Sequence, residues 1–418
     1  MKISRKLMPF AVAAALAVPA SGAIAGGFGI GTQSGSGTGN AFAGGAAAAD
    51  DSSVSWYNPA AMFALAPGKQ IAVAGHALKP SFKFTNAGST GAFLGAGTGE
   101  GNDGGDWAFV PNAFYTMDIN PNWRFGFAVN APFGLKTDYD AGWRGRFQAL
   151  KSDIKSVNLN PSIAYKVSDR LSIGAGVSVQ KIDATLTSDA TAAALGLVTL
   201  KADDVGYGFN LGMIYQATPE TRIGAHYRST IRYDVEGSLT LSGAAVGNGG
   251  IRADLVVPDS LSFSVFHKLN PKWELMGDVT WTGWSSVQNL TVVRTTTTAL
   301  GAAGSVFTNL LFRWDDTWRV GVGANYKVND NMKLRFGVAF DQTPTNDVDR
   351  TPKLPDQDRT WIAIGVQHRL SKAGVLEAGY AHEFVKDASI NNVTAVGTLR
   401  GSFKNKADIF SLQYSHSF

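Results

Sequence analysis

The sequence predicts an all-β fold, a transmembrane antiparallel β-barrel of about 14 strands. From Lys69 onward, about 14 segments alternate apolar and polar residues. They are joined in strict alternation by tight turns, such as Asn120-Pro121 and Asn270-Pro271, and by long loops rich in Gly, Thr and Asp. No run of about 18 apolar residues follows the first 25, which argues against a transmembrane helix. Short periplasmic turns and long outer loops are typical of bacterial outer-membrane barrels, so we predict that location, with both ends of the barrel on the short-turn side.

The first 25 residues have the pattern of a secretory signal peptide. Lys2, Arg5 and Lys6 precede an apolar core, and Ala23-Ile24-Ala25 matches a cleavage site, so the mature chain is expected to begin at Gly26. Subtracting these three from the 37 Lys and Arg leaves 34, against 33 Asp and Glu. A nearly neutral mature chain gives no reason to expect a nucleic-acid partner. With no cysteine, the chain has no disulfides.

Each predicted strand separates its residues into two faces. In residues 171–180, 205–213 and 332–340 every second residue is apolar, and the residues between them are small or polar. A strand that crosses a membrane as part of a barrel directs the apolar set toward lipid and the other set toward the lumen. We therefore expect Lys333 and Arg335 to face inward.

The last segment shows the same alternation and ends the chain at Phe418. A terminal Phe preceded by aromatic residues at alternate positions resembles the signal that outer-membrane insertion machinery reads, although His416 replaces the usual apolar residue. Trp123, Trp273, Trp281 and Trp284 lie near strand ends. We predict that these tryptophans belong to the aromatic girdles of the two membrane interfaces, because amphipathic rings favour that depth.

Residues 26–68 do not alternate with a period of two. They contain a Gly-rich run, then Asp50-Asp51-Ser52-Ser53 and Asn58-Pro59-Ala60. A barrel of about 14 strands, residues 69–418, is wide enough to hold an open lumen. We therefore predict that residues 26–68 form a compact hatch, or plug, inside it.

Three sets of residues carry a resemblance to a known family. They are Asn58-Pro59-Ala60; Ala131-Pro132-Phe133-Gly134-Leu135 with Tyr139 and Trp143-Arg144-Gly145-Arg146; and Thr351-Pro352-Lys353-Leu354-Pro355-Asp356 with Arg359 and Trp361. In this order, over the whole mature chain, they resemble the FadL-type long-chain fatty acid transporters, a family that includes aromatic-hydrocarbon uptake proteins such as TodX.

The resemblance implies passive uptake of hydrophobic molecules, with capture in an outer groove and storage in a lumenal pocket. It also implies release through a gap in the barrel wall at a kinked third strand, after movement of the hatch. Here the third strand reaches Ala131-Pro132-Phe133-Gly134. Proline donates no ladder hydrogen bond and glycine weakens a strand, so a break in the wall at these residues is one interpretation. The other is that Pro132 simply ends the strand at its loop.

Apolar residues in the outer loops are candidates for the capture groove, because exposed apolar patches usually mark binding surfaces. The alternative is that they extend the strands and pack on each other. The candidates are Leu195, Leu197, Val198, Leu239, Leu241 and Val246, with a second stretch at Ala299–Leu311.

A cation near an apolar slot would orient a ligand carboxylate. Arg144 and Arg146 are candidates, as are residues expected to face inward: Arg319, Lys327, Lys333, Arg335 and Arg369. Most lumenal cations are expected to pair with Glu274, Asp278, Glu377 and Glu383, so the sequence does not single out one of them.

Other classes of protein have less support. None of the six histidines lies in a nucleophile or metal-binding motif, so we predict no enzyme activity, no metal and no cofactor. The expected partners are a hydrophobic ligand and membrane lipid, and the expected state is a monomer. The alternatives that stay open are an aromatic-hydrocarbon channel, a general porin for polar solutes and a structural or adhesin-type barrel.

Overall fold

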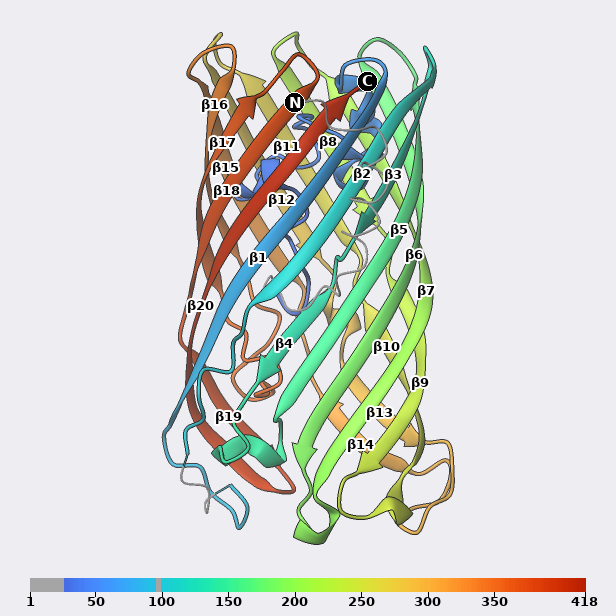
Figure 1. Cartoon of the computed structure of the whole chain (residues 1–418), viewed down its shortest axis with the longest axis vertical. Coiled ribbons are helices and arrows are strands. Elements are labelled where there is room, and N and C mark those ends of the chain that lie inside the picture. The colour runs from blue at the N-terminus through green and yellow to red at the C-terminus, as the bar shows by residue number, and fades with distance from the viewer. Residues whose placement is uncertain (1–25, 95–98) are drawn as a thin grey trace, which may run out of the picture.

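A computed structural model describes residues 26–94 and 99–418, so the predicted signal peptide, residues 1–25, lies outside the described residues. Its strands form one antiparallel sheet that closes on itself (Figure 1). Within these residues, no helix has the length and apolar character needed to cross a membrane.

Short helices occur in the N-terminal segment and in the loops: α2 (Gly35–Thr38), α3 (Val54–Tyr57), η1 (Pro59–Ala64), η2 (Arg144–Phe147), η3 (Ala193–Leu195), η4 (Ala245–Gly247) and η5 (Trp284–Ser286). The strands are β1 (Lys69–Asn86), β2 (Ala108–Asn120), β3 (Trp123–Asn130), β4 (Gly134–Asp138), β5 (Lys151–Lys166), β6 (Leu171–Asp189), β7 (Leu197–Gln216), β8 (Thr221–Arg228), β9 (Ile231–Leu241), β10 (Gly249–Val257), β11 (Ser260–Lys268), β12 (Trp273–Thr282), β13 (Asn289–Arg294), β14 (Val306–Leu311), β15 (Thr317–Lys327), β16 (Met332–Asp341), β17 (Arg359–Arg369), β18 (Gly374–Val385), β19 (Ala388–Thr394) and β20 (Gly397–Ser417).

The barrel has 14 antiparallel crossings, as the sequence predicts. Some crossings are interrupted and carry two labels, namely β3/β4, β8/β9, β10/β11, β12/β13, β14/β15 and β18/β19. The first and last strands close the sheet along a ladder that runs from Gln70 opposite Ser417 to Asn86 opposite Gly401. This closure pairs the two edges that an open sheet would expose to lipid.

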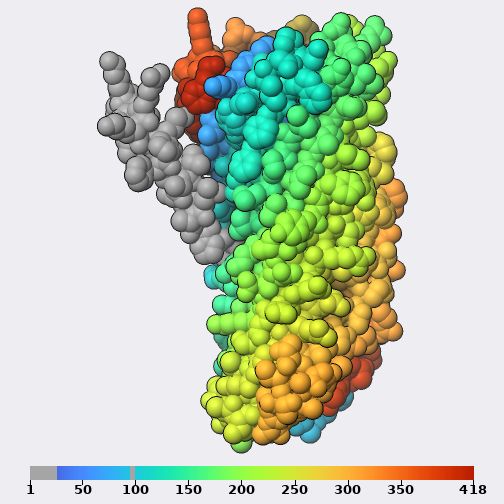
Figure 2. Space-filling view, turned by 90° about the vertical axis from the view of Figure 1, so that its right-hand side faces the viewer, coloured from blue at the N-terminus to red at the C-terminus, as the bar shows by residue number. Residues whose placement is uncertain are grey.

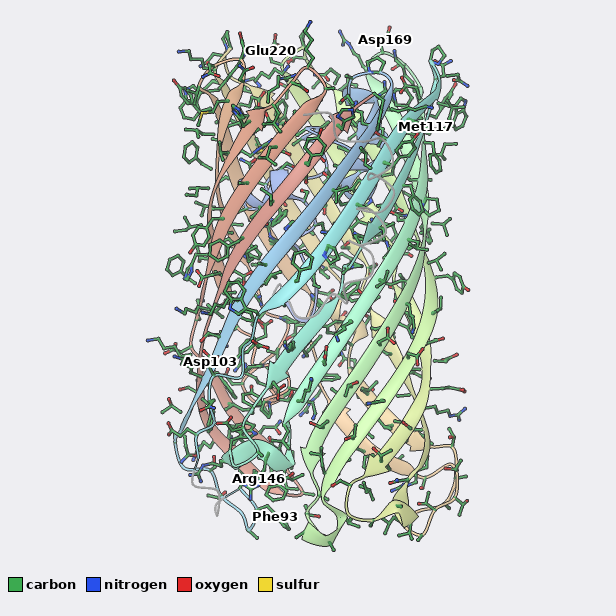
Figure 3. The ribbon with its side chains drawn as sticks, in the orientation of Figure 1. Phe93, Asp103, Met117, Arg146, Asp169 and Glu220 are labelled. Atoms are coloured by element: carbon green, nitrogen blue, oxygen red, sulfur yellow. The ribbon has the colours of Figure 1, made fainter. Side chains whose placement is uncertain are left out.

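The predicted strand faces are confirmed. On β16, Phe336, Val338 and Phe340 are exposed on the outer surface, whereas Arg335 is only 1% exposed and faces the lumen. On β20, the apolar residues of the terminal alternation are exposed and Gln413 is buried. The tight turns that hold Asp169 and Glu220 lie at one end of the barrel, and the loops that hold Phe93 and Arg146 lie at the other (Figure 3).

The prediction of aromatic girdles is wrong for Trp284, whereas Trp123 at the turn end lies on the outer surface, where a girdle residue has to lie. Trp123 is exposed and its ring lies 4.7 Å from the ring of Tyr165. Trp284 is only 2% exposed and packs inside the barrel, 5.1 Å from the ring of Phe28. The strand alternation does not apply to it, because β12 ends at Thr282 and η5 then takes the chain inward.

The N-terminal segment, residues 26–68, lies in the lumen near the turn end, where it is drawn in blue in Figure 1. Its backbone and side chains bond to the inner wall. The amide of Gly35 donates to Oε1 of Gln413 (2.9 Å), and Nδ2 of Asn58 donates to the carbonyl of Met213 (2.9 Å). The lumen of this wide barrel is therefore partly filled by polypeptide.

The Asn58-Pro59-Ala60 motif fixes this segment through a helix cap. The Asn58 side chain accepts a hydrogen bond from the Ala60 amide (3.1 Å), Pro59 occupies the first turn of η1, and Asn58 Nδ2 also donates to the Ala46 carbonyl (2.7 Å). Asn is a favourable N-cap, and Pro is tolerated where no amide donor is needed. One side chain thus joins a helix end, a loop and the barrel wall.

Glycines on the inner wall let the N-terminal segment approach closely. A Cβ at Gly337 would collide with the backbone of Asn40, and one at Gly224 would collide with Ala46. Only glycine leaves room for a second backbone at these positions. The wall and the segment are therefore complementary in shape.

Replacing Gly337 should displace the N-terminal segment while the barrel still forms. In Gly337→Val we expect higher ion conductance in planar bilayers, because the added side chain occupies the space of the Asn40 backbone. Gly277→Val is the matched control, since a Cβ at Gly277 would meet only the Gly321 carbonyl oxygen, at 3.5 Å. Equal conductance of the two folded variants would contradict this packing.

Candidate functional site

A large apolar cavity lies among the loops at the loop end of the barrel. Its volume is about 830 Å³, within the ordinary size range of small-molecule sites. Apolar side chains from several loops and strand ends contribute to its wall: Leu186, Leu195, Val198, Leu200, Leu241, Leu300, Phe307, Leu310, Leu311, Val393 and Val396. We call this space the outer cavity.

The structure brings together only some of the residues that the sequence suggested for ligand capture. Leu195, Val198 and Leu241 line the outer cavity, and so do Phe307, Leu310 and Leu311 of the second stretch. Leu239 is instead buried in a core, Leu197 packs against another cluster, and Val246 is 66% exposed and does not line the cavity. Sequence alternation does not show how far each loop folds back, so it did not separate these two groups.

The arginines suggested for a ligand carboxylate do not line the outer cavity. Arg144 donates to the carbonyl of Leu94 (3.1 Å), and Arg146 pairs with Asp189 (3.1 Å). Both belong to η2, so the fold of their own loop satisfies them. In this protein the two arginines of the motif stabilise the loop and do not face a ligand in the outer cavity.

Three other basic side chains line this cavity instead: Arg294, Lys353 and Arg313, the last of which pairs with Asp349. Nζ of Lys353 donates to the carbonyl of Gln148 (2.6 Å), and burial lowers the pKa of Lys353 to about 8. The ammonium is therefore still mostly charged at neutral pH. An acidic head group entering the outer cavity would meet a positive charge.

A second, smaller cavity lies deeper in the lumen, between the N-terminal segment and the wall. Its volume is about 240 Å³. Aromatic, hydroxyl and charged side chains line it: Phe42, Trp56, Tyr57, Phe133, His226, Arg228, Ser262, Asp278, Thr280, Trp284, Arg319 and Trp361. We call this space the inner cavity.

Arg228 is the unusual cation of the inner cavity. Its guanidinium donates to Oγ of Ser178 (3.2 Å) and the carbonyl of Trp56 (3.0 Å), and its Cζ lies 3.3 Å from the Trp56 ring centroid. Within the described residues, no carboxylate oxygen lies within 4 Å of it, and residues 1–25 and 95–98 contain no Asp or Glu. The sequence prediction missed Arg228, although it shares the inward parity of Arg222 and His226 on β8.

Most other lumenal cations have acidic partners, as the sequence predicted, although Arg222 on β8 forms no ion pair with a carboxylate of the described residues. Arg319 pairs with Asp278 (3.4 Å), Lys333 pairs with Glu274 (3.0 Å), and NH1 of Arg359 lies 3.5 Å from Glu383. Arg335 is buried between two carboxylates, Glu377 at 2.5 Å and Asp50 at 2.9 Å. Lys327 and Arg369, expected to face the lumen, are instead exposed at the turn end, because they are the last residues of their strands.

The barrel wall is interrupted next to the inner cavity. The β2–β3 ladder stops at Ala113 opposite Val129, although β2 continues back to Ala108 along β1. β4 resumes at Gly134 but pairs only with β5. Residues 131–133 are therefore a break within the third crossing, and Pro132 is not simply the end of the strand.

The N-terminal segment covers this break from the lumen. The Ile30 amide donates to the Pro132 carbonyl (2.7 Å), and the Gly134 amide donates to the Phe28 carbonyl (2.9 Å). Gln33 links the two sides, because its Nε2 donates to the Ala131 carbonyl (3.0 Å) while its backbone carbonyl accepts from Asn112 Nδ2 (2.9 Å). These bonds satisfy backbone groups that the wall leaves unpaired.

The second and third sequence motifs meet around this region, whereas Asn58-Pro59-Ala60 contacts Ala46 and the wall at Met213. The hydroxyl of Tyr139 donates to the carbonyl of Pro352 (2.8 Å), and its ring stacks on Trp143 with centroids 4.3 Å apart. Asp356 accepts from the Gly27 amide (2.9 Å) and pairs with Arg359. The loop with the third motif thus joins the start of the N-terminal segment to the wall.

The described ranges hold no group of three or more His, Asp or Glu residues placed to bind a metal ion. The arrangement consists of two cavities, a covered break in the wall and a few cations, which suits binding and passage of a ligand.

A sequence model of one protein family matches this chain over nearly its whole length. The sequence model described as "Outer membrane protein transport protein (OMPP1/FadL/TodX)" matches residues 16–418. A putative outer membrane protein of Neisseria meningitidis serogroup B is 30% identical, over 94% of this chain and 95% of its own. The long-chain fatty acid transport protein of Salmonella typhi is 24% identical, with 98% of each chain covered.

Solved structures agree on the fold. A FadL homologue of Pseudomonas aeruginosa is 28% identical and has a TM-score of 0.85, covering 94% of this chain and 100% of its own. The toluene transporter TbuX of Ralstonia pickettii has a TM-score of 0.68 at 22% identity, covering 91% of this chain and 98% of its own. At this low sequence identity, the similarity to TbuX shows only that the two proteins share a fold.

A charge placed in the outer cavity should weaken binding of an apolar ligand. We expect Leu195→Glu to bind a fluorescent apolar probe about tenfold more weakly, because a lost apolar contact is worth roughly 1.5–3 kcal/mol and the carboxylate resists burial. The control is Val246→Glu, which changes a nearby exposed side chain outside the cavity. Similar losses in both variants would show that the outer cavity is not the capture site.

Proposed function

The chain belongs to the outer membrane protein transport family that includes FadL and TodX, and we propose that its ligands are long-chain fatty acids or similar amphipathic acids. The family transports hydrophobic compounds across the outer membrane. The ligand class follows from the inner cavity, and the route runs from the outer cavity to the break in the wall.

The observation that carries the proposal is Arg228. It lines a cavity and has no carboxylate partner among the described residues, so part of the desolvation cost of its guanidinium is left without compensation. The carboxylate of a fatty acid would supply the missing partner while its chain contacts Phe133, Trp284 and Trp361. Lys353 would attract the same head group at the outer cavity.

The proposed route starts in the outer cavity and ends at the break in the wall. Pro132 and Phe133 line the inner cavity and belong to the break, so a ligand held there lies beside the opening. Residues 28–33 cover it through a few hydrogen bonds. Their movement would let the ligand pass sideways into the membrane without ATP and without covalent chemistry.

Two alternatives remain distinct from this proposal. The inner cavity exceeds the roughly 150 Å³ that holds benzene in an engineered site, so an aromatic hydrocarbon would fit, as the name of TbuX suggests for that protein. Such a ligand would leave Arg228 unpaired. A general porin for polar solutes has less support, because residues 26–68 occupy the lumen.

Uptake by cells tests the ligand class. In a host lacking its own transporter, we expect the protein to increase uptake of labelled oleate strongly, of toluene weakly and of a sugar not at all. A host carrying the empty vector is the control. Sugar uptake without any gain for oleate would refute the proposal in favour of a porin.

Arg228 should distinguish acids from hydrocarbons. In Arg228→Gln we expect oleate affinity to fall about tenfold or more, since a charge-assisted hydrogen bond is worth roughly 1.5–3 kcal/mol, while toluene affinity stays unchanged. The matched control is Arg222→Gln, on the same face of β8 but outside the inner cavity. Unchanged oleate binding in the folded Arg228 variant would remove Arg228 as the head-group site.

A further inference from the structure

A row of lysines lies on the outer surface of the barrel, where β1 and β20 close the sheet. Lys79 and Lys83 on β1, and Lys404 and Lys406 on β20, are all exposed. Their strand neighbours, such as Phe82 and Asn405, are buried on the lumenal side. The four lysines therefore share the outward face of the wall.

The register of the closing ladder places these lysines next to one another. Lys83 stands directly opposite Lys404, Lys406 stands opposite Ser81, and Lys79 stands opposite Asp408. Opposite Cβ atoms are about 4.5–5.5 Å apart and diagonal ones about 7–8 Å, so Lys79, Lys406, Lys83 and Lys404 form a continuous zigzag. Like charges directly opposite each other destabilise a sheet unless something compensates them.

Within the described residues, Asp408, which stands opposite Lys79 and attracts Lys406, offsets only part of this charge. None of the four ammonium groups lies within 4 Å of a carboxylate oxygen, and the undescribed residues contain no Asp or Glu. Two acids on or beside these strands, Asp408 and Asp103, accept hydrogen bonds from other donors. Asp408 accepts from His382 and Tyr380, both at 2.7 Å, and Asp103 accepts from the Ser81 hydroxyl and the Phe82 amide, both at 2.6 Å.

The wall formed by β6 to β10, seen from outside in Figure 2, differs from the β1–β20 face in its balance of charge. At the same end of the barrel its outward residues alternate in charge, and Lys181 lies 3.0 Å from Asp183 and 3.3 Å from Asp203. Acidic residues there offset the basic ones. The excess of positive charge is thus a property of the β1–β20 face.

The position of the lysines along the strand fits the edge of the membrane. Phe410 and Leu412 share their outward face on β20 and are 47% and 57% exposed. Lys406 lies four residues further toward the loop end, about 13 Å along the strand. Nζ of Lys79 lies 5.4 Å from the centroid of the Trp107 ring, an exposed aromatic of the kind that marks the interface.

We infer that the lysine row of β1 and β20 binds the phosphate groups of an anionic glycolipid in the outer leaflet, namely lipopolysaccharide. Lysine ammonium groups bind phosphate as point charges, and several of them side by side neutralise a doubly charged group. A lipid fits this surface better than a soluble anion, because its acyl chains can lie along Phe410 and Leu412 while its head group reaches the lysines.

Native mass spectrometry of the full-length protein in detergent tests this inference. The probes are bisphosphorylated lipid A, the same lipid without phosphates, and inorganic phosphate. We expect the unmodified protein to retain bisphosphorylated lipid A, and the variant Lys83→Gln/Lys404→Gln/Lys406→Gln to retain at least about tenfold less. The lipid without phosphates should bind both proteins equally weakly.

The matched control removes the same number of positive charges elsewhere: Lys181→Gln/Lys201→Gln/Arg232→Gln on β6, β7 and β9. Both triple variants should keep heat-modifiable migration on gels and full oleate binding, which separates this site from transport. Unchanged lipid A binding by the β1–β20 variant would overturn the inference. An equal loss in the control, or displacement of lipid A by an equal concentration of inorganic phosphate, would also overturn it.

Discussion

The structure depends on the closure of one hydrogen-bonded sheet. The bilayer core offers no water, so each unpaired backbone group there costs several kcal/mol. The ladder between β1 and β20 supplies partners for the two strands that would otherwise be edges. Because the sheet must close with this number of strands, the barrel is wide, and its interior needs other polypeptide to fill it.

The N-terminal segment meets this need with short polar contacts and close backbone packing. Asn58 joins a helix cap to the wall, and wall glycines such as Gly337 leave room for the segment. The same requirement for paired backbone explains the break at residues 131–133. Where β2 and β4 do not pair, backbone groups of Phe28 and Ile30 bond to the third crossing. The break is therefore covered by the one part of the chain that does not belong to the wall.

Much of the fold could be predicted from alternation alone. Lipid-facing residues such as Phe336 and Val338 repeat with a period of two, and the alternating loop lengths set the strand number and the end at which the chain finishes. The prediction failed at Trp284, just beyond the end of β12, because a period of two carries no information once the chain leaves the sheet. It also failed for Arg144 and Arg146, whose own loop uses their hydrogen-bonding groups.

The sequence by itself determined the barrel, its outer-membrane location and its family, because these follow from local periodicity and from motifs that are continuous in the chain. Only the tertiary structure decided which loop residues form the outer cavity, since Leu195 and Phe307 are far apart in sequence and meet through folded loops. It also decided that Arg228 has no acidic partner in the part of the chain that the structure describes, and that Lys83 stands opposite Lys404. Pairing of charges depends on distances across the sheet and the lumen, and the order of residues along the chain does not contain these distances.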